Sequence, residues 1–199
     1  IRWLDHDKEY DAELQLGVES DTLDLEGTLT PPKPVTATEE AIRAAGAALV
    51  GEVALPVPAY SAVKVGGRRL HEAARAGEAV EAPVRTFRVD ALTVTEVAPP
   101  RVRFHVACGG GTYVRSLAAA WGTALGCGAV LASLVRTRSG SFRLADAQSL
   151  DVLEGPGGRV AAAGALVTVA DALTHLLAAR LPGDQLHRVW RGQTVPVPS

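Results

Sequence analysis

The sequence has no methionine, only two cysteines and few aromatic residues, which make up 5% of its 199 residues. Cys108 and Cys127 form neither a Cys-x-x-Cys pair nor part of a Cys/His cluster, so the sequence predicts no disulfide framework and no metal site. No apolar run is long enough to cross a bilayer, and the first residues lack the pattern of a signal peptide. We therefore expect a cytoplasmic protein that does not bind membranes.

The motifs of several common enzyme classes are also missing. There is no Walker phosphate loop, no Gly-x-Ser-x-Gly elbow and no His-Glu-x-x-His helix. Their absence argues against nucleotide hydrolysis, serine hydrolase and zinc protease activity. The net charge of −2 and the isoelectric point near 6.2 do not by themselves indicate a nucleic-acid-binding protein. Any such binding depends on local clusters of basic residues.

The chain starts with Ile1 in the middle of an alternating polar and apolar pattern, and methionine is absent throughout. We therefore expect it to be a fragment of a longer protein. Its hydrophobic content of 47% is enough for a proper core, either in one domain or in a domain with a small appendage.

Periodic patterns along the chain predict a mixture of helices and strands. Strands are predicted over residues 10–16, 86–94, 101–107 and 141–144. A helix is predicted over residues 36–50, after a proline-rich linker, with Thr36 and Glu39 as a capping box. A second, alanine-rich helix is predicted after the glycine-rich break at residues 155–158, and it ends near Arg180.

The segment from Gly109 to Leu117 places a tyrosine and an arginine at the start of an apolar helix that follows a strand. Thr112 is the predicted N-cap, and Gly126 is at the position of a C-terminal cap. The apolar residues at helical spacing are Val114, Leu117, Ala118, Trp121 and Leu125. Tyr113 and Arg115 should lie near the helix mouth, away from this apolar stripe. An arginine in a first turn opposes the helix dipole, so Arg115 is either solvated or facing a carboxylate or phosphate.

Two basic segments lie beside glycine turns. The first contains Lys64, Arg68 and Arg69, and the second contains Arg136 and Arg138. Lysine and arginine neutralise phosphates, and glycine lets the backbone approach closely, so both segments suit contact with nucleic acid. An ordinary basic hairpin on the surface is the alternative for the first segment.

A polar, turn-like segment over residues 20–27 contains several carboxylates. Their spacing is not that of an EF-hand, so the pattern favours a solvated loop or helix caps over a metal site.

Taken in order, the motifs of the chain resemble those of the TruB family of tRNA pseudouridine synthases. They are Asp7-Lys8-Glu9-Tyr10, the segment Leu16–Asp24, Tyr60-Ser61-Ala62-Val63-Lys64, Gly111-Thr112-Tyr113-Val114-Arg115, Leu125–Ala129 and Arg136-Thr137-Arg138-Ser139-Gly140. Together they cover residues 5 to about 150, and their order is far more specific than any one motif.

The resemblance implies an α+β fold with a mixed, largely antiparallel central sheet and flanking helices. Residues 1–180 would form the catalytic domain without its N-terminal part, and residues 181–199 the start of a truncated C-terminal RNA-binding appendage. The implied substrate is uridine 55 in the T-loop of tRNA. The implied partner is therefore tRNA, through its T-stem-loop, with no protein partner and a monomeric state.

Pseudouridine formation detaches uracil from ribose and rejoins it through carbon, which requires a carboxylate and a platform for the ring but no cofactor. By resemblance, Tyr10 stacks against the flipped uracil, Arg115 pairs with the catalytic carboxylate, and Leu134 lines the base pocket. Tyr113 supports that pocket. The residues expected to contact RNA are Lys64, Arg68, Arg69, Arg136 and Arg138.

The sequence departs from the family pattern at the nucleophile. The family's catalytic aspartate lies in a Gly-x-Leu-Asp-Pro-like motif before the strand that begins here at Tyr10, and this sequence has no such motif. The nearby aspartates, Asp5, Asp7, Asp21 and Asp24, are poor replacements because they lack its context or match other family positions. Val130 also stands where the family commonly has histidine.

Two hypotheses follow from the resemblance and the missing motif. The chain is either most of the catalytic domain of a tRNA pseudouridine synthase, cut at both ends, or a non-catalytic tRNA-binding remnant or RNA-folding helper.

Overall fold

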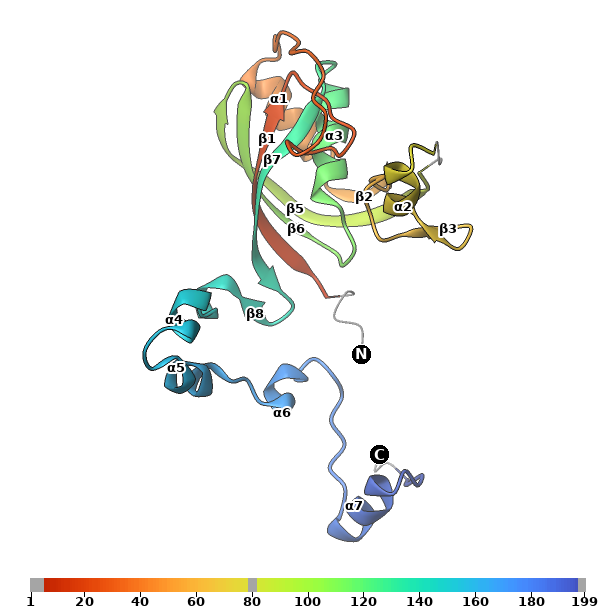
Figure 1. The fold of residues 1–199 in the computed structure, drawn as a ribbon, viewed down its shortest axis with the longest axis vertical. Helices are drawn as coiled ribbons and strands as arrows, with labels where there is room; N and C mark the ends of the chain where they lie inside the picture. The colour runs from red at the N-terminus through yellow and green to blue at the C-terminus, as the bar shows by residue number, and fades with distance from the viewer. Residues whose placement is uncertain (1–5, 79–81, 197–199) are drawn as a thin grey trace. The chain divides into compact units, whose positions relative to one another are not determined.

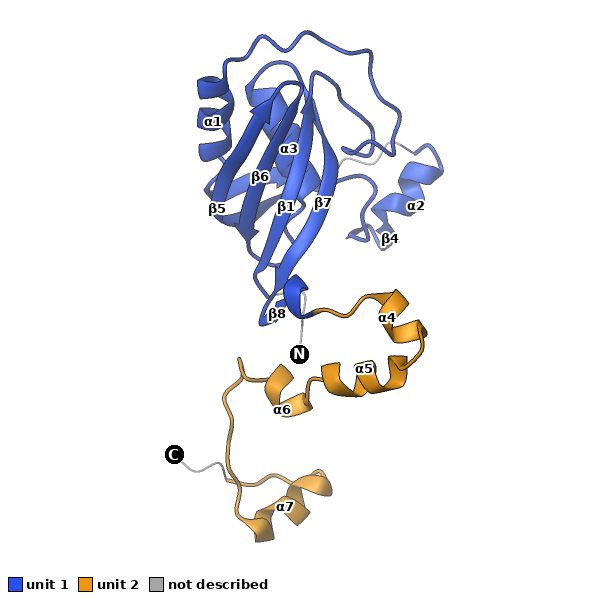
Figure 2. Cartoon of the chain, turned by 90° about the vertical axis from the view of Figure 1, so that its left-hand side faces the viewer, with its two compact units in different colours: residues 1–146 blue, residues 147–199 orange. Residues whose placement is uncertain are grey.

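The computed structural model, shown in Figure 1, describes residues 6–78 and 82–196. The chain divides into two compact units, residues 1–146 and residues 147–199 (Figure 2). The predicted boundary near residue 180 rests on the domain layout of the family rather than on compactness, and it remains a prediction.

The first unit is built on a six-stranded sheet in the order β2-β5-β6-β1-β7-β8 (Figure 1). Its strands are β1 (Lys8–Leu16), β2 (Gly51–Pro56), β5 (Val84–Ala98), β6 (Arg101–Cys108), β7 (Ala129–Ser139) and β8 (Phe142–Arg143). All neighbouring strands in this sheet run antiparallel. A separate hairpin pairs β3 (Lys64–Val65) with β4 (Arg68–Arg69). The predicted α+β fold class is confirmed.

Short helices accompany the sheet. In the first unit they are α1 (Glu39–Ala47), α2 (Leu70–Arg75) and α3 (Val114–Ala124), with a 3-10 turn at Leu144–Asp146. In the second unit they are α4 (Leu150–Glu154), α5 (Gly158–Ala165), α6 (Val169–Ala172) and α7 (Gly183–Trp190). Among the described residues, no helix has the length and apolar character needed to cross a membrane.

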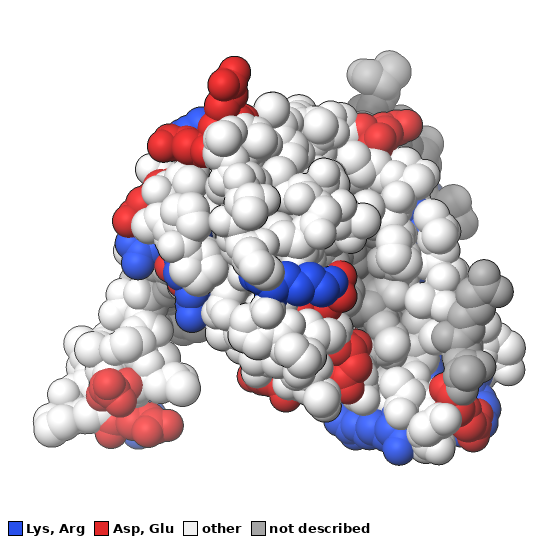
Figure 3. Space-filling view, turned by 90° about the horizontal axis from the view of Figure 1, so that it is seen from above, with Lys and Arg blue, Asp and Glu red and all other residues white. Residues whose placement is uncertain are grey.

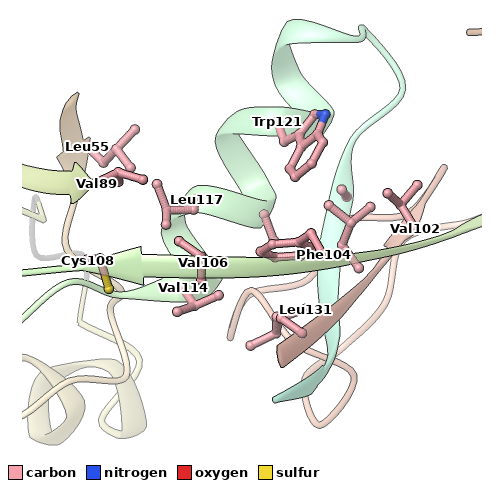
Figure 4. Close-up of a cluster of buried hydrophobic side chains, with 14 of the residues drawn as sticks. Leu55, Val89, Val102, Phe104, Val106, Cys108, Val114, Leu117, Trp121 and Leu131 are labelled. Carbon is pink, nitrogen blue, oxygen red and sulfur yellow. The ribbon is translucent and has the colours of Figure 1, made fainter. Parts of the chain in front are cut away.

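The core lies on one face of the sheet, under α1 and α3. Alternation along β1 and β6 puts an apolar residue on this face at every second position, which buries Ala12, Leu14, Leu16, Val102, Phe104 and Val106. Helix α3 contributes Trp121, which points toward Phe104, and Leu117, which lies between Val89 and Val106 in Figure 4. The indole Nε1 of Trp121 also donates to the carbonyl of Ile42 in α1 over 2.9 Å, so this side chain joins both helices.

The opposite face of the sheet is polar and carries a ladder of ion pairs. Glu13 on β1 accepts hydrogen bonds from Arg101 at 2.7 Å and Arg103 at 2.8 Å, both on β6. The Arg103 guanidinium, followed by Arg101, holds the pKa of the Glu13 carboxyl below its usual value, against the effect of burial. The two faces of β1 therefore have distinct roles, one in packing and one in surface electrostatics.

The predicted strands all exist, but the boundaries and two elements differ from the prediction. The observed strands β5 and β6 extend beyond the predicted ranges of 86–94 and 101–107, whereas β8 is only the centre of the predicted 141–144 segment. Strands β2 and β7 were not predicted. Strand β7 has eleven residues, an apolar stretch followed by arginines, and lacks a simple polar and apolar alternation. Its register with β1 is interrupted by bulges, and a bulge changes which residues share a face, so a strand of this kind need not alternate in sequence.

Two predicted helix caps are wrong by one or two residues. Helix α1 begins after Thr38, whose side chain accepts from the Ala41 amide at 3.2 Å. The capping box of Thr36 and Glu39 therefore does not form. Helix α3 begins after Tyr113, because the Thr112 hydroxyl donates to the Gly109 carbonyl at 2.8 Å instead of capping the helix.

The prediction of one alanine-rich helix ending near Arg180 is also wrong. Helix α5 stops at Ala165 because Leu166 has an extended backbone (φ −65°, ψ 122°). Thr168 then caps a new short helix by accepting from the Asp171 amide at 3.1 Å. Thr168, as the acceptor, thus begins a separate helix where a single alanine-rich one was predicted.

Gly46 provides a test of how tightly α1 packs against α3. It is buried in α1, and a Cβ at this position would overlap the indole ring of Trp121. We expect Gly46→Ala to lower the free energy of unfolding by about 1–3 kcal/mol, because overpacking outweighs the gain in helix propensity. Denaturant unfolding followed by circular dichroism measures this.

The control is Ala44→Gly on the exposed side of the same helix, which should cost about 1 kcal/mol through propensity alone. A stabilised Gly46→Ala protein would contradict the observed packing.

Candidate functional site

Arg115 lies in the first turn of α3 and donates hydrogen bonds to three acceptors in two separate segments of the chain. Its Nη1 donates to the carbonyl of Thr22 at 3.0 Å and to Oδ2 of Asp24 at 3.0 Å. Its Nη2 donates to the carbonyl of Tyr60 at 3.1 Å. The Arg115 side chain retains 24% of its exposure. The guanidinium therefore ties the loop after β1 and the segment before β3 to the start of α3.

The loop after β1 presents Asp24 to this arginine in a fixed orientation. The Oδ1 atom of Asp24 accepts from the Thr22 hydroxyl at 2.5 Å and from the Glu26 amide at 3.1 Å, which leaves Oδ2 for Arg115. The loop is also anchored to the sheet, because the Leu131 amide on β7 donates to the carbonyl of Leu23 at 3.0 Å. Hydrogen bonds from the protein therefore fix the orientation of the Asp24 carboxylate.

This finding corrects one expectation and decides between two alternatives. The sequence favoured a solvated loop or helix caps for residues 20–27, whereas Asp24 forms a partly buried ion pair, with 21% of its side chain exposed. Arg115 was expected to be either solvated or facing a carboxylate or phosphate, and the structure shows it facing the carboxylate of Asp24. Asp24 lies 91 residues away in the sequence, and no local pattern connects the two positions.

A cavity of about 320 Å³ adjoins the ion pair. Its lining residues are Asp24, Leu25, Glu26, Arg115, Leu131, Ala132, Ser133 and Leu134. It thus brings together two of the predicted site residues, Arg115 and Leu134, with a carboxylate and apolar side chains. Ligand sites commonly combine an apolar wall with a few polar groups in this way.

Two other cavities of the first unit have similar volumes. One, of about 320 Å³, lies around Gly17 and is lined by residues of 15–18, 32–35 and 99–100, and the other, of about 360 Å³, lies over the polar face of the sheet near Asp11. Neither is lined by a predicted site residue, so the cavity beside Arg115 is the candidate functional site.

Tyr10 lies on β1, opposite Val106 of β6 and Arg136 of β7. Directly opposed residues of antiparallel strands share a face, so Tyr10 and Arg136 project from the same side of the sheet. The next pair on that side is Ala12 with Leu134, which places Tyr10 one step along the sheet from a cavity residue. Burial raises the pKa of the Tyr10 phenol, and Arg136 opposes this shift.

Tyr113 has a structural contact of its own. It is the N-cap residue of α3, and its ring meets that of Phe87 on β5 edge to face, with centroids 6.0 Å apart. It does not line the cavity beside Arg115. Its role in supporting the base pocket therefore stays a prediction. The contact that the structure shows for Tyr113 is its packing on Phe87 at the start of α3.

The first basic segment forms an exposed hairpin. Lys64 and Arg69 are directly opposite each other, and Gly66 and Gly67 make the turn with positive φ angles of 59° and 86°. Arg68 forms an ion pair with Glu78 at 2.8 Å.

The charged side chains do not gather by sign on the face of the molecule that is seen from above. Figure 3 shows acidic and basic side chains lying next to one another on this face.

The aspartates weighed as replacement nucleophiles have other environments. Asp7 pairs with Arg88, Asp21 accepts from the Thr28 amide at 2.8 Å, and Asp5 lies outside the described residues. Within the described ranges, no group of three or more His, Cys, Asp or Glu side chains is placed to hold a metal ion.

Comparison with known proteins decides the family. The model of the TruB family pseudouridylate synthase N-terminal domain matches residues 2–114 of the chain, which is more than half of it. The chain belongs to the TruB family. The match includes Tyr10, Asp24, Lys64 and Tyr113 and ends one residue before Arg115.

Curated TruB relatives extend the similarity. The tRNA pseudouridine synthase B of Xanthomonas campestris pv. campestris (strain B100) is 47% identical over 147 residues, which are 73% of this chain and 48% of that protein. The tRNA pseudouridine synthase B of Thiobacillus denitrificans is 44% identical over 194 residues, which are 97% of this chain and 64% of that protein. The chain thus spans about half the length of the first of these relatives.

Solved structures agree with the fold. A Cbf5-Nop10-Gar1 complex contains a chain 30% identical to this one, with a TM-score of 0.55, covering 75% of this chain and 36% of that one. An H/ACA RNP bound to a substrate RNA containing 2'-deoxyuridine contains a chain 26% identical, with a TM-score of 0.51, covering 76% and 34%.

A double-mutant cycle tests the ion pair at the centre of this site. We expect Asp24→Asn and Arg115→Gln to show a coupling energy of about 1 kcal/mol in the free energy of unfolding, because the pair is partly shielded from water. The control is the exposed pair of Glu39 and Arg43 on α1, for which about 0.3–0.5 kcal/mol is expected. A coupling no larger than that of the control would contradict the geometry of the site.

Proposed function

We propose that this chain carries the base-binding side of the catalytic cleft of a tRNA pseudouridine synthase that isomerises uridine 55 in the T-loop of tRNA. The observation that carries the proposal is the cavity beside the Arg115–Asp24 pair, bordered by Leu134. The names of the curated TruB relatives support the reaction. The enzyme is proposed to act without a cofactor, as a monomer in the cytoplasm.

Arg115 has the capacity to hold a second carboxylate. A guanidinium has five N–H donors, and the hydrogen bonds to Thr22, Asp24 and Tyr60 use three of them. The remaining donors suit the nucleophilic aspartate of the family, which we propose comes from a segment that this sequence does not contain. A guanidinium that binds a carboxylate stabilises the ionised form of that carboxylate.

Asp24 suits a positioning role better than a nucleophilic one. Each of its carboxylate oxygens already accepts a hydrogen bond, one from Arg115 and the other from Thr22 and the Glu26 amide. These bonds disperse its negative charge and fix its orientation. Asp24 would therefore hold the guanidinium in place while a second carboxylate reacts.

The cavity fits the size of one detached base. Its volume of about 320 Å³ is at the lower end of the range for small-molecule sites. An enzyme reaches the glycosidic bond only after the nucleotide leaves its stack, so Leu134 would contact the flipped uracil and Tyr10 would stack on it.

Basic residues would hold the RNA backbone around the cleft. The exposed hairpin carrying Lys64, Arg68 and Arg69 is proposed to contact phosphates of the T-stem-loop. Such contacts contribute affinity that depends on salt and little direct chemistry. Because these contacts are local, they do not require the protein as a whole to carry a net positive charge.

The alternative is a non-catalytic tRNA-binding protein or RNA-folding helper. It is favoured by the lack of any Gly-x-Leu-Asp-Pro-like motif in the 199 residues. The two functions differ in whether a supplied nucleophile restores the reaction.

The first test of function therefore supplies that nucleophile. We expect the 199-residue chain alone to form no pseudouridine in a T-stem-loop. A chimera that joins to it the preceding segment of the Xanthomonas campestris relative should form pseudouridine, measured by tritium release or by mass shift after derivatisation.

The control chimera replaces the aspartate of the family motif by asparagine and should be inactive. Activity of the chain alone, abolished by heating, would place a nucleophile within these residues. An inactive chimera that is folded and binds RNA would favour the non-catalytic alternative.

A second test separates catalysis from binding in the active chimera. Arg115→Lys should lower the single-turnover rate by roughly a hundredfold and leave RNA affinity nearly unchanged, because an ammonium cannot reproduce the fixed fork of the guanidinium. Lys64→Ala should instead weaken binding and flatten the slope of log affinity against log salt by about one unit.

Lys33→Ala is the matched control, since Lys33 pairs with Glu19 outside the predicted RNA contacts, and it should keep the original salt slope. Equal losses of rate and affinity in Arg115→Lys, or an unchanged slope in Lys64→Ala, would mean that the two roles are wrongly assigned.

A further inference from the structure

Arg136 stands directly across from Tyr10 on the neighbouring strand. The register between β1 and β7 pairs Tyr10 with Arg136 and Ala12 with Leu134, so these side chains share the face of the sheet that carries α3. The Arg136 guanidinium lowers the pKa of the Tyr10 phenol, against the raising effect of burial. The sequence suggested only an RNA contact for this arginine.

The second arginine of the same motif is engaged elsewhere. Arg138 forms an ion pair with Glu9 at 2.8 Å and donates to the Gly140 carbonyl at 3.1 Å. In a regular strand, residues two positions apart project to one face. Here the register shifts between Glu9 and Tyr10, so Arg136 is opposite Tyr10 while Arg138 is opposite Glu9. The bulge therefore gives the two arginines different partners.

Tyr10 needs an anchor if its ring is to act as a platform. The phenol is half-buried and lies near Cys108 of β6 as well as Arg136 of β7. Packing against the core constrains the ring near the sheet, but the far end of the ring is the hydroxyl. A guanidinium on the residue directly opposite can restrain this end of the side chain through the hydroxyl, which a phenylalanine lacks.

We propose that Arg136 is a positioning residue that acts through the Tyr10 hydroxyl and holds the ring in the orientation needed to stack on the uracil. The contact itself depends only on the β1–β7 register, whereas its effect on the reaction rests on the proposed function. Binding of an RNA phosphate by Arg136 is the competing assignment, and the experiments below are designed to separate the two.

The contact is tested first on the 199-residue chain by NMR, with tyrosines labelled at Cζ. Tyr10→Phe identifies the Tyr10 resonance among the three tyrosines. The charged or titratable groups acting on the phenol are Arg136 and Cys108. Because Arg136 lowers the pKa of the phenol, Arg136→Gln should move the Tyr10 titration to higher pH.

Arg138→Gln is the matched control, since it removes the same charge two residues away on the same strand and should leave the Tyr10 titration in place. Circular dichroism over the same pH range checks that the variants stay folded. An unchanged titration in Arg136→Gln, or an equal shift in Arg138→Gln, would overturn the proposed contact whatever the protein's activity.

The effect on the reaction is tested by a double-mutant cycle in the active chimera. Arg136→Gln should lower the single-turnover rate by about tenfold when Tyr10 is present and by less than about twofold in the Tyr10→Phe background. Equal rate losses in both backgrounds, or a loss of RNA affinity with a flatter salt slope in both, would overturn the positioning role and assign Arg136 to a phosphate. An inactive chimera would count against the proposed function, while the NMR titration still decides the contact.

Discussion

The guanidinium of Arg115 holds the candidate site together. A cation in the first turn of a helix faces the positive end of the helix dipole, so it is stable there only if nearby groups compensate. Asp24 supplies a negative charge, and the carbonyls of Thr22 and Tyr60 supply further acceptors. These three acceptors come from two segments far apart in the sequence. Their hydrogen bonds to one side chain place the loop after β1 and the segment before β3 around the same cavity.

The position of Arg115 depends in turn on the core beneath it. Helix α3 is fixed on the sheet by Leu117 and by Trp121, which packs edge to face on Phe104 at 5.3 Å and hydrogen-bonds to α1. Because buried side chains pack closely, the helix has little freedom to move relative to β1, β6 and β7. Packing on the apolar face of the sheet thus determines where the Arg115 guanidinium lies. The opposite face, which carries the ion pairs of Glu13, is exposed to solvent.

The distribution of charge explains why the composition points away from an RNA enzyme while the family membership points toward one. Many basic residues are partnered by acidic ones, as in Arg68 with Glu78 and Arg138 with Glu9. The net charge therefore says little about any single surface. The arginines differ in their surroundings: Arg115 forms an ion pair with Asp24, Arg138 forms one with Glu9, and Arg136 lies directly opposite Tyr10.

The sequence by itself determined the strands with clean alternation, such as β1 and β6, the apolar stripe of α3, and the order of motifs that identifies the TruB family. These features depend on residues that are close together in the sequence, so they can be predicted from residue type and spacing. Only the tertiary structure decided that Asp24 is the partner of Arg115, that a backbone carbonyl of Tyr60 completes the site, and that a bulge separates Arg136 from Arg138. A backbone acceptor has no side-chain signature, and a pair 91 residues apart or a register shift depends on how distant segments pack. The path of the whole chain, and not the local pattern, fixes those contacts.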